Sequence, residues 1–252
     1  MNSLVSVVTP VYNSADFLRR TFISLSDQTY TNWEWILVDD CSTDDSICLI
    51  NEFVQQDSRV KLLCNSENAG SGVARNKAIE ASKGKFVAFL DSDDIWHKEK
   101  LAIQVEFMEK NAIPFSHTSY GYIDEFDRKI KSTFHVSKHP VSYFDLLKRT
   151  EISCLTAMYN CEELGKFYMS EHRRKQDYAL WLAILKTGIC SHPIDIELAY
   201  YRQTPNSATS KKYTLIFKHF LFLRATQEMG IIRAFYYTGF WATNGFIRYY
   251  IR

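Results

Sequence analysis

The sequence lacks the features of a repetitive, disordered or membrane-spanning chain. Only 9 Gly and 5 Pro occur among its 252 residues, and 46% of the residues are hydrophobic. This composition excludes collagen-like, linker-rich and disordered proteins. Lys218, Arg224 and Arg233 interrupt the longest apolar stretches, so none reaches the roughly 18 to 20 residues that cross a bilayer. The length predicts one large domain, or one domain with an appendage.

A net charge of one sign is also missing. The 30 basic and 29 acidic residues leave +1, so we expect no nucleic-acid partner. The distribution is uneven, because Lys211 to Arg252 holds seven basic residues and one acid, whereas residues 1–210 hold 23 basic and 28 acidic ones. The same C-terminal segment contains twelve of the 37 aromatic residues. That density is unusual for a solvated extension, so we expect something to cover the aromatic surface.

Paired cysteines and a leader are absent as well. The six cysteines show no C-x-x-C spacing, which argues against a zinc site or a disulfide framework and favours free thiols in a reducing compartment. No basic residue precedes the first apolar run, as one would in a signal peptide. We therefore expect a cytoplasmic location.

Apolar runs and amphipathic stretches alternate through about the first 110 residues. This alternation predicts an α/β domain in which helices connect parallel strands. Pro10 is expected to end the first strand, and Ser14 and Thr43 are expected to cap the first two helices. The predicted strands are 4–8, 33–38, 60–63 and 86–90. The last of these is continuously apolar, which predicts a central strand buried on both faces.

Beyond Phe115 the periodicity weakens. It predicts a hairpin at 124–129, a helix at 143–147, a strand at 154–159, a helix at 178–185 and an extended segment at 194–201.

Acidic and turn residues follow the predicted strands, at the sheet edge where ligands of open α/β sheets bind. Asp91-Ser92-Asp93-Asp94 comes directly after the buried strand. Carboxylates two residues apart on a turn can share a hard cation that completes its shell with phosphate oxygens. The alternative is that Asp93 or Asp94 only caps a helix beginning near Ile95.

Two further groups could contact a nucleotide. Asp39 and Asp40 could accept hydrogen bonds from a base or ribose, or could form an Asx turn. The 70–72 Gly-Ser-Gly turn and Arg75 could meet phosphate at a helix N-terminus, or Arg75 could be a surface ion-pair partner. Neither G-x-x-x-x-G-K-[ST] nor G-x-G-x-x-G is present, so kinase-like and dinucleotide sites are excluded.

Asp177 is the candidate general base. It stands at a predicted helix start, close to three cations at 173–175 that would keep it ionised. The alternative is an acid that only complements the helix dipole.

Five segments together resemble a family 2 glycosyltransferase of the GT-A fold, in order and spacing over about the first 210 residues. They are Val5–Asn13 (VSVVTPVYN), Leu37–Asp45 (LVDDCSTDD), Asn68–Asn76 (NAGSGVARN), Phe89–Asp94 (FLDSDD) and Gln176–Trp181 (QDYALW).

The resemblance implies roles for individual residues. Asp91 and Asp93 would be the D-x-D pair that holds Mn²⁺ or Mg²⁺, with Asp93 preferred as the direct ligand. Asp177 would be the catalytic base, although Gln176 replaces the Glu that usually precedes it. The segment 201–207 resembles an Arg-x4-Ser loop near the diphosphate. The nucleotide-sugar contacts implied are Thr9, Pro10, Tyr12, Asn13, Asp39, Asp40, Arg75, Asp91, Ser92, Arg202 and Ser207.

The implied activity is inverting, metal-dependent transfer from a nucleoside-diphosphate sugar, a UDP-hexose or UDP-N-acetylhexosamine, to a glycan hydroxyl. The family's small bacterial members suggest a lipid-diphosphate-linked acceptor in O-antigen or capsule synthesis. A non-catalytic nucleotide-sugar-binding partner of another transferase is the alternative, and a nucleotidyltransferase is disfavoured because the N-terminal phosphate loop is missing.

The expected organisation is a GT-A catalytic domain at 1–210 followed by a helical extension at 211–252. Within the domain, 1–110 would bind the nucleotide sugar and 111–210 would supply the base and acceptor site. The extension mixes aromatic and basic residues as interfacial segments do. We expect it either to contact the inner face of the cytoplasmic membrane or to pack on the catalytic domain or a second subunit, as in a homo-oligomer.

Overall fold

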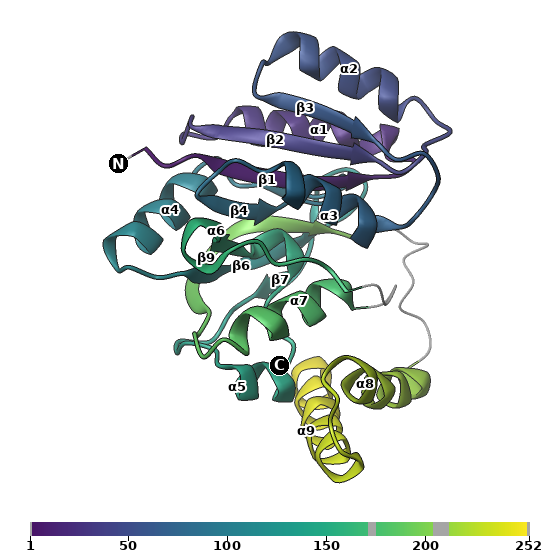
Figure 1. The fold of residues 1–252 in the computed structure, drawn as a ribbon, viewed down its shortest axis with the longest axis vertical. Coiled ribbons are helices and arrows are strands. Elements are labelled where there is room, and N and C mark those ends of the chain that lie inside the picture. The colour runs from purple at the N-terminus through teal and green to yellow at the C-terminus, as the bar shows by residue number, and fades with distance from the viewer. Residues whose placement is uncertain (1, 171–174, 204–211, 251–252) are drawn as a thin grey trace.

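The computed structural model describes residues 2–170, 175–203 and 212–250 (Figure 1). Its strands are β1 (Val5–Val11), β2 (Trp33–Asp39), β3 (Val60–Cys64), β4 (Phe86–Phe89), β5 (Ile95–Trp96), β6 (Phe115–Ile123), β7 (Lys129–Phe134), β8 (Met158–Asn160) and β9 (His192–Arg202). Its helices are α1 (Ala15–Ser26), α2 (Ser46–Gln56), α3 (Ser71–Ala81), α4 (Lys100–Lys110), α5 (Tyr143–Lys148), α6 (Cys161–Leu164), α7 (Gln176–Leu185), α8 (Lys212–Thr226) and α9 (Ile231–Tyr250).

All of these strands form one mixed sheet in the order β3-β2-β1-β4-β8-β6-β9-β5, with β7 paired to β6. The first four strands of the α/β half are parallel, as predicted. β4 lies between β1 and antiparallel β8, which confirms that it is central. β6 and β9 run parallel, and the predicted 124–129 hairpin joins β6 to β7.

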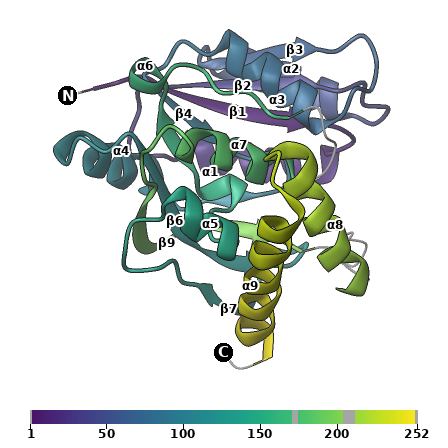
Figure 2. The same ribbon diagram turned by 60° about the horizontal axis from the view of Figure 1, so that its bottom comes forward.

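Helices cover both faces of the sheet (Figure 2). The side chains of each strand alternate between two cores, one on each face. Val7 and Leu37 face the core that contains α1, α2 and α4. Val8 and Val38 face the core that contains α3, α5 and α7. The carboxyl ends of β1, β2 and β4 are therefore left uncovered between the two helical layers, where a ligand can reach them.

Several local predictions were wrong. Pro10 does not end β1, since the strand continues to Val11 beside β2, at a level that β4 does not reach. Proline, which has no backbone N–H, is tolerated at this position because β4 offers no partner that would need one. Ser14 is the N-cap residue of α1, as predicted, although its side chain makes no cap hydrogen bond, whereas Thr43 caps no helix because the N-cap residue of α2 is Asp45. The 154–159 segment divides into a 3₁₀ turn, Cys154–Thr156, and β8.

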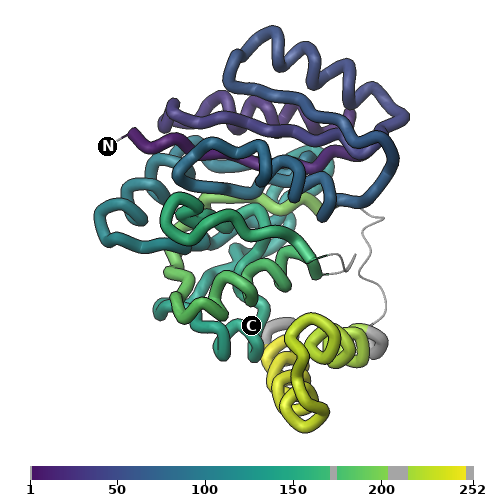
Figure 3. Tube along the Cα trace, viewed as in Figure 1, coloured from purple at the N-terminus to yellow at the C-terminus, as the bar shows by residue number. Residues whose placement is uncertain are grey.

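The C-terminal helices α8 and α9 lie at the end of the molecule opposite to α2 and β3 (Figures 1 and 3). Phe222, Leu223 and Ala234 on one side of the pair are buried in the same core as α5 and α7. Ile232 and Phe235 on the other side are 86% and 63% exposed. Packing on the catalytic domain therefore covers only part of the extension. Across the described ranges, no helix combines the length and apolarity needed to cross a membrane.

Candidate active site

A cavity of about 360 Å³ opens where β1, β2 and β4 end. Four elements contribute to it: the β1–α1 loop, the loop after β2, the N-terminal turns of α3 and the acidic loop after β4. Of the predicted contacts it brings together Pro10, Tyr12, Asn13, Asp40, Arg75, Asp91, Ser92 and Asp93, and it adds Ser71.

The loops around this cavity are fixed by their own polar contacts. Asn13 has left-handed backbone geometry (φ 47°), and its Oδ1 accepts a hydrogen bond from the Thr43 amide at 2.7 Å. Asp39 is buried, and its Oδ2 accepts from the Ser42 amide at 3.0 Å, which is the Asx turn considered as an alternative for this pair. The cavity wall is thus rigid before any ligand arrives.

Asp40 fixes the start of α3. Its Oδ1 accepts from the Ala69 amide at 3.0 Å, and its Oδ2 accepts from the Gly70 amide at 2.7 Å. Gly70 has φ 94°, a left-handed value that glycine adopts without steric cost. These bonds aim the N-terminus of α3 at the cavity, and a helix N-terminus favours phosphate.

Arg75 and Asp91 form an ion pair inside the cavity, with Arg75 Nη2 2.5 Å from Asp91 Oδ1. Burial alone would lower the pKa of Arg75, but Asp91 outweighs burial, and the pKa is raised. The surface ion-pair reading of Arg75 is wrong, because the residue is only 9% exposed. A fixed cation is therefore available to an anionic ligand.

Burial dominates the titration of the acidic loop, although Arg75 and Arg202 lie close to it. Burial and the neighbouring Asp91 raise the pKa of Asp93 to about 6. Burial, Asp93 and Asp91 raise the pKa of Asp94 well above its ordinary range, and Asp94 Oδ2 has no hydrogen-bond partner among the described residues. The helix-cap alternative for Asp93 and Asp94 is wrong, because Ile95 begins a strand.

These carboxylates fit a hard divalent cation, since a cation would relieve their repulsion. The structure describes no cluster of three or more His, Cys, Asp or Glu side chains arranged as a metal site.

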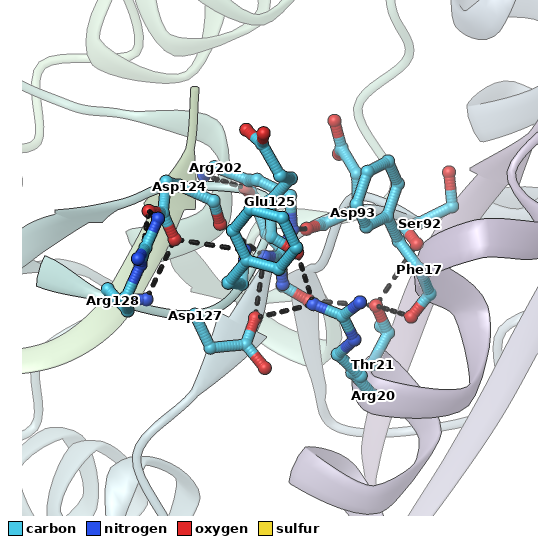
Figure 4. Close-up of polar contacts among 12 residues, drawn as sticks. Phe17, Arg20, Thr21, Ser92, Asp93, Asp124, Glu125, Asp127, Arg128 and Arg202 are labelled. Carbon is cyan, nitrogen blue, oxygen red and sulfur yellow. Dashed lines mark hydrogen bonds and ion pairs between the residues drawn. The ribbon is translucent and has the colours of Figure 1, made fainter. Parts of the chain in front are cut away.

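Arg202 lies beneath the acidic loop instead of lining a cavity (Figure 4). Its Nε donates to the Asp93 carbonyl and its Nη1 to the Asp124 carbonyl, both at 2.6 Å. Its Nη1 also pairs with Asp127 at 2.5 Å, and the guanidinium stacks over Phe17. A side chain this deeply buried holds the loop in shape, and the diphosphate contact predicted for Arg202 has no support in its placement.

Two other predicted contacts, Thr9 and Asp39, do not line this cavity. Thr9 is fully buried: its Oγ1 donates to the Leu90 carbonyl at 2.6 Å and accepts from Trp35 Nε1 at 2.7 Å. These bonds connect β1 to the end of β4, so Thr9 is corrected to a structural role. Ser207 lies outside the described residues.

A second cavity, of about 490 Å³, adjoins the first and shares Ser71, Arg75 and Asp91 with it. It is lined in addition by residues from β6, the 3₁₀ turn, α7 and the end of β9. These are Tyr120, Tyr122, Ser153, Cys154, Leu155, Lys175, Gln176, Asp177, Tyr201 and Gln203. The two cavities therefore form one continuous site with Arg75 and Asp91 at the junction.

Asp177 faces this second cavity from the first turn of α7. Burial raises the pKa of its carboxyl, against the Tyr178 amide and Arg75, which lower it. A carboxylate with a raised pKa is a better proton acceptor near neutral pH. The preceding Gln176 packs against Gly72 of α3, where a Cβ would come within 2.0 Å of the Gln176 amide nitrogen. Gln176 thus holds the start of α7 against the start of α3.

The tyrosine wall of the second cavity was missed by sequence reasoning. Tyr120 and Tyr122 lie on one face of β6 with ring centres 5.3 Å apart, and Tyr201 meets Tyr122 edge to face. The i, i+2 spacing of Tyr120 and Tyr122 could have indicated a shared strand face. Their apposition to Asp177 could not have been read from it.

Comparison with known proteins agrees with this geometry. The model of the family "Glycosyl transferase family 2" matches residues 6–167. TuaG of Bacillus subtilis, named as a teichuronic acid biosynthesis glycosyltransferase, is 39% identical over 92% of this chain and 91% of its own length. WfgD of Escherichia coli, a UDP-Glc:alpha-D-GlcNAc-diphosphoundecaprenol beta-1,3-glucosyltransferase, is 36% identical over 92% of this chain and 90% of its own length.

Solved structures show the same fold. The crystal structure of S. aureus TarS 1–349 in complex with UDP-GlcNAc superposes with a TM-score of 0.70 at 20% identity, covering 96% of this chain and 74% of that TarS fragment. The mannosyltransferase PcManGT from Pyrobaculum calidifontis, in complex with GDP-Man and Mn²⁺, gives 0.66 at 18% identity over 94% of this chain and 70% of its own. The chain belongs to glycosyl transferase family 2 and is a glycosyltransferase of the GT-A fold.

Proposed function

We propose that the protein transfers a sugar, with inversion, from a nucleoside-diphosphate sugar to a hydroxyl of a lipid-diphosphate-linked glycan. The observation that carries this proposal is the junction of the two cavities. Arg75 and Asp91 line both, the acidic loop lies on one side, and Asp177 lies on the other. A donor bound across the junction would present its anomeric carbon to an acceptor held near Asp177.

The first cavity takes the nucleotide. Tyr12 is 51% exposed at its mouth and offers a ring face to the base. The N-terminus of α3 and the Arg75 guanidinium supply positive charge to the diphosphate. Asp91 and Asp93 would hold Mg²⁺ or Mn²⁺, which when bound neutralises charge on the diphosphate leaving group.

Asp177 acts as the general base. It accepts the proton of the acceptor hydroxyl while that oxygen forms a bond to the anomeric carbon. The bond from the anomeric carbon to the diphosphate oxygen breaks, and its electron pair leaves with the nucleoside diphosphate. Arg75 and the α3 N-terminus stabilise that developing charge. Attack opposite to the leaving group inverts the configuration, so an α-linked donor gives a β-glycoside.

The substrate class follows from the relatives. WfgD and WfaP of Escherichia coli are named for UDP-Glc and a diphosphoundecaprenol-linked acceptor, and TuaG for teichuronic acid synthesis. We extend this to a UDP-hexose or UDP-N-acetylhexosamine donor and a role in bacterial surface polysaccharide synthesis. The exposed side of α9, with Phe235 and Ile232 near Arg233, would contact the cytoplasmic membrane that carries such an acceptor.

The experiment is a nucleoside-diphosphate release assay over a panel of nucleotide sugars, with Mn²⁺ or EDTA and with or without a GlcNAc-diphospho-lipid acceptor. We expect one UDP-sugar to give metal-dependent release that the acceptor stimulates. Nucleotide binding without release from any donor and acceptor of the panel would contradict the proposal. Release unaffected by EDTA would contradict its metal dependence.

A further inference from the structure

Lys175, which directly precedes α7, is enclosed by side chains of the C-terminal helices. Its Nζ lies 4.3 Å from the ring centre of Trp241 on α9 and 5.8 Å from that of Phe222 on α8. The ring centre of Tyr178, on α7 itself, is 5.6 Å away. The Nζ is also 2.7 Å from His219 Nδ1 on α8. An ammonium held in this way has cation–π partners on several sides.

His219 serves as an acceptor in this enclosure. Burial and the adjacent Lys175 lower the pKa of His219 to about 3, so its ring is neutral and Nδ1 can accept from the ammonium. The His219 ring in turn stacks on Trp241 with centres 4.2 Å apart. The two helices therefore present one preformed surface to Lys175.

That surface is attached to the catalytic domain independently of Lys175. Trp241 Nε1 donates to Thr150 Oγ1 at 2.9 Å, and Asn244 Nδ2 donates to the Lys148 carbonyl at 3.0 Å. Both acceptors lie at the end of α5. Since α9 is fixed there, its contact with Lys175 restrains the beginning of α7.

The backbone of Lys175 needs such a restraint. It has left-handed geometry, φ 53° and ψ 39°, which disfavours a residue with a side chain. Its carbonyl accepts the hydrogen bond of the Ala179 amide at 2.9 Å, so it forms the first turn of α7. Asp177 projects from this turn into the second cavity. Moving Lys175 would therefore move the carboxylate.

We propose that α8 and α9 position the catalytic base: Trp241 and His219 hold Lys175, and Lys175 holds the turn that carries Asp177. The C-terminal extension then affects the active site through Lys175, in addition to any contact that it makes with a membrane. Trp241 and His219 are positioning residues, since neither of them lines the two cavities that hold the acidic loop and Asp177. The assignment of a catalytic effect rests on the proposed function, whereas the restraint on α7 does not.

The test compares the full-length protein with Trp241→Ala, Lys175→Met and the double variant. Two variants on the same helix serve as controls: Trp241→Phe keeps a ring at the contact, and Ile231→Ala removes an apolar side chain that is 57% exposed at the start of α9. Hydrogen exchange of the Ala179 amide reports the turn, calorimetry with UDP reports nucleotide binding, and initial rates with a water-soluble short-chain acceptor report transfer.

We expect Trp241→Ala to speed Ala179 exchange at least tenfold and to lower kcat about tenfold, with UDP affinity changed less than twofold. Trp241→Phe should restore both, and Ile231→Ala should match the wild type. Lys175→Met should give the same losses, and the double variant should lose no more than the worse single one, because both changes break one contact.

Unchanged Ala179 exchange in Trp241→Ala would overturn the proposal, as would additive losses in the double variant or equal losses in Ile231→Ala. A wild-type protein that transfers no sugar, but whose Ala179 amide still responds to Trp241→Ala, would refute the proposed function and leave the restraint standing.

Discussion

The two cavities of the active site are built in different ways. The first is made of loops that follow neighbouring parallel strands, and hydrogen bonds between those loops, such as Asp40 to Gly70 and Asn13 to Thr43, fix their shape. The second is assembled from β6, the 3₁₀ turn, α7 and β9, which are far apart in the chain. Asp177 and the tyrosine wall meet only because those elements pack together.

This difference separates donor binding from catalysis. The proposed nucleotide cavity is lined by residues between 10 and 93, so changes in the second half of the chain should leave it intact unless they reach Arg202, which holds the acidic loop. The base depends on packing contacts, including those of Gln176 with α3 and of Lys175 with α8 and α9. Mutations can therefore remove transfer while nucleotide binding is kept.

The largest expected effect is that of Asp177→Asn. The amide keeps the shape of the side chain but cannot accept the acceptor proton, so kcat should fall about 10²- to 10⁴-fold. UDP affinity measured by calorimetry should stay within twofold. Asp16→Asn, an exposed acid in the first turn of α1, is the matched control and should retain full activity. Full transfer by Asp177→Asn would refute the assignment of the base.

The second half of the chain, which supplies most of the second cavity, also contains an ion pair with a buried carboxylate that should stabilise the fold. Glu151 is 3% exposed, contacts Arg149 at 2.8 Å and accepts from the Ser137 amide. Burial would raise the pKa of Glu151, but the neighbouring His117, 3.8 Å away, the hydrogen bond from the Ser137 amide and the charge of Arg149 outweigh burial and lower it to about 2. Because the folded-state pKa is depressed, the stabilisation is complete above about pH 4.5 and is lost as the pH falls towards 2.

Replacing this carboxylate should therefore destabilise the fold. Glu151→Gln should lower the free energy of unfolding at pH 7 by about 3 kcal/mol in urea denaturation. The exposed Glu52, paired with Arg19, gives the comparison, and Glu52→Gln should cost about 0 to 1 kcal/mol. An equal loss of unfolding free energy in the two variants would show that the pair of Glu151 and Arg149 does not stabilise this part of the fold.

A smaller change at the contact of the two regions should affect transfer more than binding. In Gly72→Ala the new Cβ would overlap the Gln176 side chain and displace the start of α7. A shift near 1 Å at a catalytic group lowers kcat by about 10- to 100-fold. Gly239→Ala on α9, where a Cβ meets nothing within 4 Å, should be neutral. A Gly72→Ala enzyme with normal kcat would mean that α3 does not position the base.

The smallest expected effect is the change of the transfer rate with pH. Since burial raises the pKa of Asp177, its carboxylate is protonated at a higher pH than an exposed Asp. The transfer rate should therefore fall tenfold for each unit of pH below that pKa, and UDP binding should not follow this limb. The limb should be missing from the residual activity of Asp177→Asn. A limb that persists there would assign the titration to another group.

Sequence reasoning predicted the first region better than the second for a physical reason. The strands before Asp39 and Asp91 are short apolar runs, and parallel order then places their ends at one edge. Errors there were local. Pro10, which has no backbone N–H, fits within β1 because no hydrogen bond to β4 is needed at that position. The Ser14 side chain makes no hydrogen bond to the first turn of α1.

The second region could not be predicted at the same level. Asp177 was predicted as a base from the cations that precede it and from the family pattern around it, but its spacing alone did not decide between a base and an acid that complements the helix dipole. Tyr201 reaches Tyr122, and Trp241 reaches Lys175, through contacts between residues far apart in sequence. Arg202 was predicted to touch the diphosphate, but the turn that begins at Asp124 encloses it beneath the acidic loop. Such contacts follow from packing, which no local pattern encodes.

The most direct test of the central claim is a crystal structure with UDP, Mn²⁺ and a non-transferable sugar donor. We predict the nucleotide beside Tyr12 and Asp40, the diphosphate and metal between Arg75 and the Asp91 and Asp93 carboxylates, and the anomeric carbon facing Asp177. A nucleotide bound outside the first cavity, or a sugar turned away from the cavity that Asp177 lines, would contradict the account of one site made from two cavities.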